Sequence, residues 1–288
     1  WQDSDSGTST ANATPYVTYT SGTYYLRSYD GNCWSPASSG VSVTINTAPS
    51  ISAHPATGGQ NLCEDASATA LSVTASGSGL SYQWYSSDDA ATNTSGDDAT
   101  VGTNSNSYSP STATPGTKYY YCVVSGTCSP AATSNVSGAI VVSATSVGGT
   151  AAAVASSVCT GSGTTINLTD YTGTIQWQTN ASSSWVDIED ETSTSYVTPN
   201  LTTTTSYRAV VTNGYCSGAN SSTAEVTVNE APTTSAAGSD QSKVDGLSFT
   251  LAANEPSVGT GVWSIVSSPD SGNDLTQFSS TSAYNATF

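Results

Sequence analysis

The stretch Ser81-Tyr82-Gln83-Trp84-Tyr85 decides the fold, because it recurs as Thr174-Ile175-Gln176-Trp177-Gln178. A weaker copy is Gly261-Val262-Trp263-Ser264, and Trp1-Gln2 is similar to the end of another. These tryptophans stand at positions 1, 84, 177 and 263, so the interval between them is nearly constant. A period of this kind is typical of tandem domains. In each copy bulky and polar residues alternate, which predicts a β-strand with one buried face.

The composition points to β structure throughout. Ser, Thr, Asn and Gly dominate the 288 residues, and only 9% are charged. Many Thr, Val and Tyr residues and frequent turn formers predict an all-β chain, and no stretch shows a helical period. The length suits about three sandwich domains of ~100 residues each. Regularly spaced Trp, Tyr and Val argue against disorder, since disordered segments lack such anchors.

The repeats share one order of features. An early cysteine is followed by a strand, the tryptophan strand, a long Tyr- and Val-rich strand, a second cysteine and a closing Val-rich strand. About seven short strands with a tryptophan on the third predict tandem immunoglobulin-like β-sandwiches. We expect them to form an elongated, semi-rigid rod, with residues missing before the first repeat and after the last. The expected domains are a partial repeat at 1–47, whole repeats at 48–144 and 145–229, and a partial repeat at 230–288.

The charge balance excludes two classes of partner. Four basic and 21 acidic residues give a formal net charge of −17. Nucleic acid needs Lys and Arg to neutralise its phosphates, and anionic membrane surfaces need the same residues. No apolar run in the sequence is long enough to span a bilayer. The acidic balance favours solubility and permits binding of divalent cations.

The cysteines predict a disulfide in each whole repeat. The repeat at 145–229 contains only Cys159 and Cys216, which we expect to pair. Aligning Tyr207-Arg208-Ala209-Val210-Val211 with Tyr120-Tyr121-Cys122-Val123-Val124 places Cys216 beside Cys128, so Cys63 would pair with Cys128. Each bond would close a loop of roughly 60 residues, worth ~3–4 kcal/mol by loop-closure entropy. Disulfides indicate an extracellular, oxidising setting.

Two cysteines remain without a partner in this scheme. Cys122 aligns with Ala209, where a small apolar residue is expected, and a free cysteine serves that purpose. The alternative is a Cys63–Cys122 bond, because Tyr120-x-Cys122 is similar to a tyrosine corner. The usual partner in that motif lies in the second strand, around Val73, where no cysteine stands. Cys33 would need a partner before Trp1.

Catalytic patterns are missing from the sequence. His54 is the only histidine, and we expect it on the surface. No serine-hydrolase, zinc-protease or phosphate-loop motif occurs, so we expect no enzyme, although paired carboxylates for glycoside hydrolysis stay open. One acidic cluster reads as a solvated loop without apolar pocket residues nearby, or alternatively as a Ca²⁺ site, the only cofactor considered. Its members are Asp187, Glu189, Asp190 and Glu191.

Aromatic residues outside the core series are the candidates for glycan binding. Sugars stack on exposed flat rings, and Trp34, Trp185 and Tyr85 lie outside the series of core tryptophans. We expect Trp185, in Trp185-Val186-Asp187-Ile188, to contact its own sheet instead.

Three stretches carry a resemblance to a known class of protein. They are Gly173-Thr174-Ile175-Gln176-Trp177-Gln178, Ser206-Tyr207-Arg208-Ala209-Val210-Val211, and Ala236-Ala237-Gly238-Ser239-Asp240-Gln241 with Gly259-Thr260-Gly261-Val262-Trp263-Ser264-Ile265. Together they resemble the tandem immunoglobulin-like and PKD-like repeats of large bacterial surface adhesins of the Bacteroidetes type. The resemblance implies export, a cell-surface filament or stalk, and adhesion to surfaces or glycans. The fourth repeat lacks the early cysteine, which suits the PKD-like type.

These observations predict a non-enzymatic, secreted structural segment. Its partners would be other repeats of the same chain or fibre, including a homo-oligomeric filament, and a surface or glycan ligand. One alternative is a polymerising fibre subunit whose partial repeats are completed by strand exchange. Another is a glycan-binding module accessory to an exported enzyme.

Overall fold

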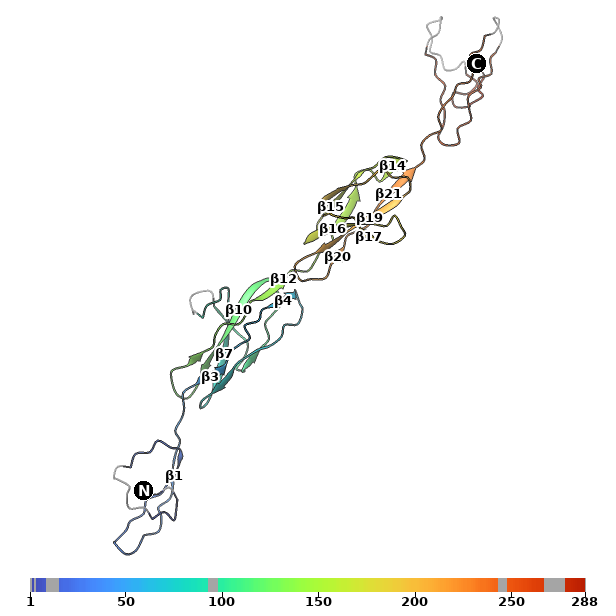
Figure 1. Ribbon diagram of the computed structural model, residues 1–288. Helices are drawn as coiled ribbons and strands as arrows, with labels where there is room; N and C mark the ends of the chain where they lie inside the picture. Colours follow the sequence, from blue (N-terminus) through green and yellow to red (C-terminus); the bar gives the residue numbers. More distant parts are fainter. Residues whose placement is uncertain are drawn as a thin grey trace. The chain divides into compact units, whose positions relative to one another are not determined.

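The chain is built from β-strands. Figure 1 shows the computed structural model, which describes residues 2, 4–8, 16–92, 98–242, 248–266 and 278–287. Two compact units divide the chain: Trp1–Thr145 with Gly214–Cys216, and Ser146–Asn213 with Ser217–Phe288. Every regular element in the described ranges is a strand. Nowhere in these ranges is there a helix with the length and apolar character needed to cross a membrane.

The first sandwich, β3 to β12, has one large sheet and two two-stranded sheets. The larger sheet has the order β4-β12-β10-β7-β8, with β11 beside β10. β4 pairs parallel with β12, whereas β10 pairs antiparallel with β7 and β12. In one small sheet β3 pairs with β6, and in the other β5 pairs with β9. The strands are β3 (Ser50–Ala53), β4 (Gln60–Cys63), β5 (Leu71–Ser72), β6 (Thr74–Ser76), β7 (Ser81–Ser87), β8 (Ala99–Val101), β9 (Ser107–Tyr108), β10 (Gly116–Ser125), β11 (Ala132–Thr133) and β12 (Ile140–Ser143).

The second sandwich, β13 to β21, repeats this topology. Its larger sheet has the order β14-β21-β19-β16-β17, with β20 beside β19, and its smaller sheet is β13-β15-β18. β14 pairs parallel with β21, the last strand, just as β4 pairs parallel with β12 in the first sandwich. The strands are β13 (Thr150–Ala153), β14 (Ser157–Cys159), β15 (Thr165–Thr169), β16 (Thr174–Thr179), β17 (Val186–Asp187), β18 (Ser195–Val197), β19 (Thr205–Thr212), β20 (Ala219–Asn220) and β21 (Ala224–Asn229). The chain thus carries tandem immunoglobulin-like β-sandwiches.

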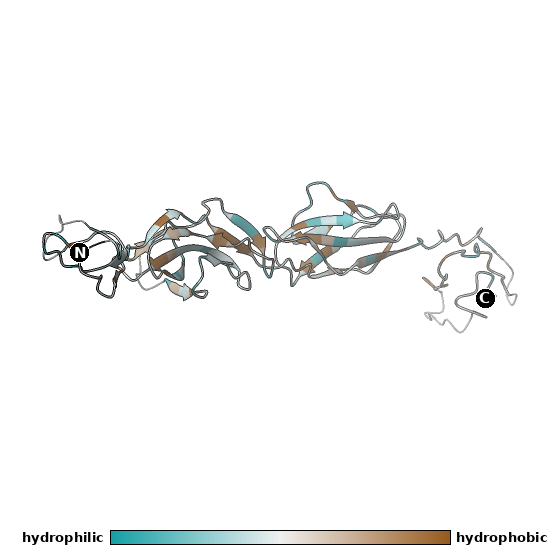
Figure 2. Cartoon of the chain, turned by 90° about the horizontal axis from the view of Figure 1, so that it is seen from below, coloured by the Kyte–Doolittle hydropathy of each residue, from teal (hydrophilic) through white to brown (hydrophobic). Residues whose placement is uncertain are grey.

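A tryptophan lies at the centre of each sandwich core. Trp84 on β7 is opposite Cys122 on β10, and Trp177 on β16 is opposite Ala209 on β19. All four residues are fully buried. Burial follows the period of a strand, because alternate residues of β19 face the core. Figure 2 shows apolar and polar residues alternating along strands of both sandwiches.

The outer repeats contain less regular structure. In the N-terminal repeat β1 (Gly22–Tyr24) pairs with β2 (Val41–Val43). The expected tryptophan of that repeat, Trp1, lies outside the described residues. Within the described part of 230–288, strand pairing is limited to an isolated bridge between Thr250 and Thr287. Trp263 still anchors this segment, since its indole N–H donates to the Ala283 carbonyl at 2.8 Å.

Candidate functional site

A disulfide links the two whole repeats covalently. Cys63, the last residue of β4, is bonded to Cys216 in the loop between β19 and β20. Their Cα atoms are 4.7 Å apart and their sequence separation is 153, a spacing in the usual range for a disulfide. The loop tip Gly214–Cys216 clusters with the first compact unit. In the loop-closure model, a disulfide that closes so long a loop stabilises the folded state by about 5 kcal/mol.

The surroundings of this bond explain why a glycine precedes it. The Ser143 carbonyl accepts the Glu64 N–H at 2.8 Å, and the Ser143 Oγ accepts the Tyr215 N–H at 3.2 Å. Cys216 Sγ lies 3.2 Å from the Ala144 carbonyl oxygen. Gly214 has a φ of +52°, and a Cβ there would stand 2.1 Å from the Ser143 Oγ. A side chain at 214 would therefore clash as well as strain the backbone.

The bond corrects the pairs expected from the sequence, Cys63 with Cys128 and Cys159 with Cys216. Cys128 and Cys159 are free thiols in the structure, as is Cys122, the alternative partner of Cys63. Cys63 is opposite Ser143 on β12. The neighbouring residue Val142 pairs with Gly116, the first residue of β10, whereas Cys128 follows the last residue of β10.

Ten residues of β10 separate these two ends, a span of about 30 Å at the usual strand rise. A disulfide needs Cα atoms within roughly 7 Å, so the bond cannot form inside the sandwich. Cys159 and Cys216 are likewise at opposite ends of β19, because Cys159 is opposite Asn229 and Cys216 follows Thr212.

Cys122 is a free cysteine inside the first core. Its side chain is fully buried opposite Trp84, where the second sandwich has Ala209. Burial raises the pKa of the Cys122 thiol to about 11. The thiolate is the reactive form of cysteine, so this thiol is unreactive at neutral pH. Cys33, the other cysteine expected to be unpaired, is free and exposed.

The acidic cluster lies in and after β17. Asp187 Oδ1 accepts a hydrogen bond from the Gln178 amide at 2.7 Å, and the Glu191 carbonyl accepts the Trp177 N–H at 3.0 Å. Across the described part of the chain, no group of three or more His, Cys, Asp or Glu residues could hold a metal ion. The Ca²⁺ candidates Asp187, Glu189, Asp190 and Glu191 therefore do not form a metal cluster.

One expectation about this cluster was wrong. A pocket of about 380 Å³ lies beside it, lined by Asp187 and Glu189 together with the apolar side chains of Ile188, Tyr196 and Leu201. The sequence did not reveal this pocket because Tyr196 and Leu201 come from later segments that the fold brings back.

The three candidate glycan-binding aromatics each have a stacking partner. The Arg208 guanidinium lies 4.3 Å from the centre of the Trp185 ring, and Arg208 Nε donates to Gln178 at 2.8 Å. Trp34 stacks on Tyr29 at 4.7 Å, and Tyr85 stacks on Tyr121 at 5.1 Å. One face of each ring is thus occupied by the protein. Trp185 contacts its own sheet, as the sequence indicated.

His54 has a structural contact. It is exposed, and its Nδ1 accepts the Asn135 N–H at 3.1 Å. This hydrogen bond ties the segment after β3 to the segment after β11.

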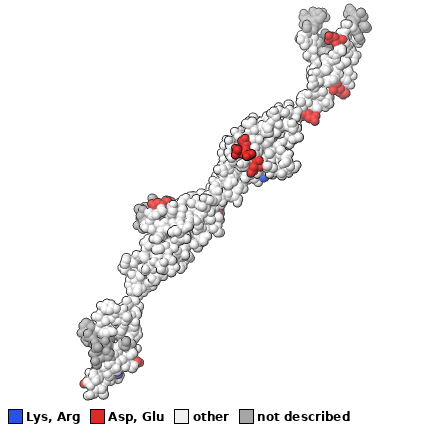
Figure 3. Space-filling view, viewed as in Figure 1, with Lys and Arg blue, Asp and Glu red and all other residues white. Residues whose placement is uncertain are grey.

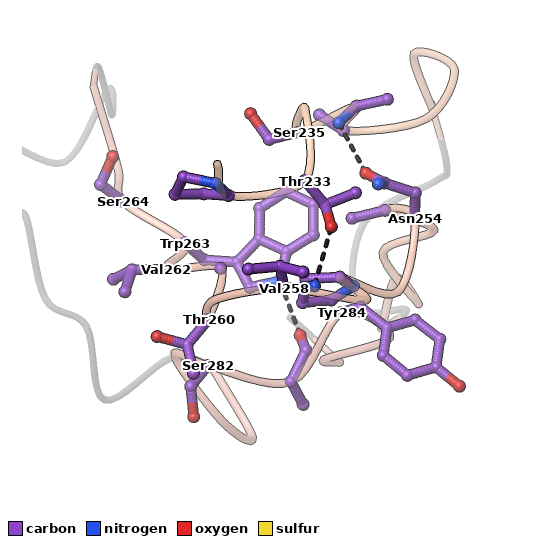
Figure 4. A pocket seen from close by; sticks show the side chains of 17 residues that line it. Thr233, Ser235, Asn254, Val258, Thr260, Val262, Trp263, Ser264, Ser282 and Tyr284 are labelled. Carbon is purple, nitrogen blue, oxygen red and sulfur yellow. Dashed lines mark hydrogen bonds between the residues drawn. The ribbon is translucent and has the colours of Figure 1, made fainter. Parts of the chain in front are cut away.

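A pocket surrounds Trp263 in the C-terminal repeat. Figure 4 shows the indole ring with Thr233, Val258 and Tyr284 around it. The pocket measures about 550 Å³. In both whole sandwiches the strand of the matching tryptophan pairs with the long strand β10 or β19 and the tryptophan is fully buried, whereas Trp263 keeps partial exposure.

Three solved structures of other proteins are similar to the chain. The N-terminal eight immunoglobulin domains of Down Syndrome Cell Adhesion Molecule match at 15% identity and a TM-score of 0.38, covering 80% of this chain and 35% of that one. Domains 1–4 of Sidekick-1 match at 14% identity and a TM-score of 0.40, covering 73% of this chain and 58% of that one. An I-band fragment of titin matches at 12% identity and a TM-score of 0.40, covering 83% of this chain and 86% of that one. The chain thus spans about a third of the first relative and little over half of the second.

At these identities the likeness concerns the fold alone. No curated protein matches the chain. A family described as "Domain of unknown function (DUF8696)" matches at residues 52–143 and again at 147–230. The two matches coincide with the two sandwiches and cover more than half of the sequence. The chain therefore belongs to this family and carries two copies of its domain.

Proposed function

We propose that the chain is a non-enzymatic structural segment of a secreted cell-surface adhesin, which projects a binding region from a cell or links the cell to a surface. The Cys63–Cys216 bond carries the proposal. It fastens one repeat to the next, as suits a spacer that holds two parts of a chain together. A disulfide is also consistent with an extracellular location.

The surface supports the same role. Figure 3 shows a face on which most side chains carry no charge, with acidic groups gathered in a few places. The net charge of −17 keeps such a chain soluble. Its natural contacts would be further repeats of the same chain or filament, and a surface or glycan at the binding region.

A replacement experiment tests this role in the cells that make the protein. Residues 48–229 are exchanged for two unrelated immunoglobulin-like domains of equal length that carry no acidic pocket. Attachment under flow is then compared with that of cells in which residues 48–229 are deleted. We expect the exchange to keep attachment and the deletion to reduce it. Loss of attachment in the exchanged cells, with normal surface display, would show that these repeats bind the ligand themselves.

A second candidate function is strand exchange between subunits of a fibre. The pocket at Trp263 favours it, because the matching tryptophans Trp84 and Trp177 are fully buried and their strands pair with β10 and β19. The occupant would be a strand from a second copy that places a small side chain against the ring, as Cys122 and Ala209 do.

A strand peptide tests this alternative. The probe is a synthetic peptide with the sequence of Thr205–Thr212, titrated into the full chain by calorimetry. Its matched control carries Ala209→Trp, which fills the space that the small residue leaves. Binding of the first peptide alone, abolished by Trp263→Ala in the chain, supports strand exchange. Equal binding of both peptides, or of neither, contradicts it.

A further inference from the structure

The cysteines of the two sandwiches occupy matching positions. Cys63 is opposite Ser143 on the parallel strand β12, and Cys159 is opposite Asn229 on the parallel strand β21. The following turns agree as well. In the first, the Glu64 N–H donates to Ser143 at 2.8 Å and the Ala66 N–H to Cys63 at 3.0 Å.

In the second turn, the Thr160 N–H donates to Asn229 at 2.8 Å and the Ser162 N–H to Cys159 at 3.0 Å. Asp65 and Gly161, in the middle of the two turns, both have positive φ, of 63° and 80°. We name Cys63 and Cys159 the early-strand cysteines. The backbone presents them in the same way, yet only Cys63 is bonded.

The other two cysteines also match. Val124 pairs with Ala132 and Val211 pairs with Ala219, so the loops 125–131 and 212–218 are of equal length. Cys128 stands in the first loop, and Cys216 stands one position later in the second. We name them the loop cysteines. Sequence order puts Cys33 in the same class, since it follows the Tyr-rich strand region of the N-terminal repeat.

These matching positions indicate a regular pattern of bonds between successive repeats, which we call the staggered rule. We propose that an early-strand cysteine bonds to the loop cysteine of the repeat that follows it, and that Cys63–Cys216 is one member of such a series. Cys159 then bonds to a loop cysteine of a following repeat. Cys128 and Cys33 each bond to an early-strand cysteine of a preceding repeat. Those partner repeats belong to a longer form of the same polypeptide or to a second copy.

Accessibility agrees with this assignment. Cys33 and Cys159 are exposed and Cys128 is partly exposed, whereas Cys122, which has no place in the rule, is buried. The span of about 25–30 Å along β10 and β19 forbids bonds within one repeat. In each bond two thiols lose two protons and two electrons. The electrons reduce a disulfide oxidant, such as an oxidoreductase of the exporting compartment, to two thiols.

Peptide mapping without reduction tests the rule on the protein secreted by its own cells. We expect the Cys159 peptide to be linked to a peptide that follows a Tyr- and Val-rich strand, and Cys128 to one that resembles residues 60–66. A gel without reductant separates the sources, because bonds to a second copy give a larger band that reduction removes. Cys159 found as a free thiol, or bonded to Cys216, would overturn the rule.

Two variants of the 288-residue chain give an independent test. In Cys63→Ser, we expect Cys216 to become alkylated by iodoacetamide and to remain unpaired with Cys159. In Cys122→Ser, the control, we expect the Cys63–Cys216 bond to form as before. A Cys159–Cys216 bond in the first variant would show that pairing within a repeat is possible and would refute the stagger.

Discussion

At the scale of single residues, Gly214 is the most constrained position near the disulfide. Its φ is +52°, and a Cβ would reach within 2.1 Å of the Ser143 Oγ. We expect Gly214→Ala to reduce the fraction of chains that form the Cys63–Cys216 bond on oxidation, measured by alkylation and mass spectrometry. Left-handed backbone strain alone is worth about 1–2 kcal/mol, and the clash adds to it.

A control variant separates a local effect at the bond from backbone strain elsewhere in the sandwich. Gly161 also has a positive φ, of 80°, but open space around its Cβ position. Gly161→Ala should leave bond formation nearly unchanged. Adding Ser143→Gly to Gly214→Ala should restore part of the loss. Equal effects of both alanine variants would contradict the clash.

Tyr207 makes the second sandwich sensitive to alkali. Burial raises the pKa of Tyr207 to about 12, and nearby Tyr196 adds to the rise. An unfolded tyrosine titrates near pH 10, so the folded state holds its phenol proton more tightly. The resulting stability is complete below about pH 10 and is lost as the pH rises toward about 12.

We therefore expect the free energy of unfolding of Tyr207→Phe to fall less than that of the unaltered chain between about pH 8 and pH 11.5. Urea titrations at both pH values measure it. Tyr19→Phe, at a position that is 88% exposed, serves as the control. An equal pH dependence for Tyr207→Phe and the unaltered chain would contradict this role of Tyr207.

At the scale of elements, the contact between β7 and β10 sets the size of residue 122. Cys122 lies against the fully buried Trp84, and its counterpart in the second sandwich is Ala209. We expect Cys122→Ala to destabilise the sandwich by about 1 kcal/mol or less, and Cys122→Leu by about 1–3 kcal/mol through overpacking. Urea unfolding measures both. If Leu is tolerated as well as Ala, the contact is looser than the structure shows.

How far the sequence predicts these elements depends on whether the signal is local. The alternation around Trp84 and Trp177 is local, and it predicted the strands and the sandwich fold. Aligning Cys122 with Ala209 predicted a small core residue, and the register of β10 and β19 agrees. The disulfide partners depend on which end of each sandwich a cysteine reaches. That follows from the parallel pairing of β4 with β12, which no local pattern reveals.

At the scale of the whole molecule, the expected semi-rigid rod remains a prediction. Linkers near Asn46, Ser143 and Asn229 are short. We expect small-angle scattering of the full chain to give an elongated particle, and we expect its flexibility to increase in a Cys63→Ser, Cys216→Ser double variant. Cys122→Ser is the control. A compact particle would contradict the rod, and an unchanged profile in the double variant would show that the bond does not limit motion.

The disulfide also changes what happens when the chain is pulled from its two ends. Tension entering at Cys63 crosses the sulfur bridge to Cys216 and bypasses everything between them. Residues 64–215 could unfold and still add nothing to the length, although fully extended they would reach on the order of 500 Å. While the bridge is intact, the distance over which the chain can be stretched is set by its covalent connectivity. A reductant would remove this restraint, and the length of residues 64–215 would then become available as they unfold.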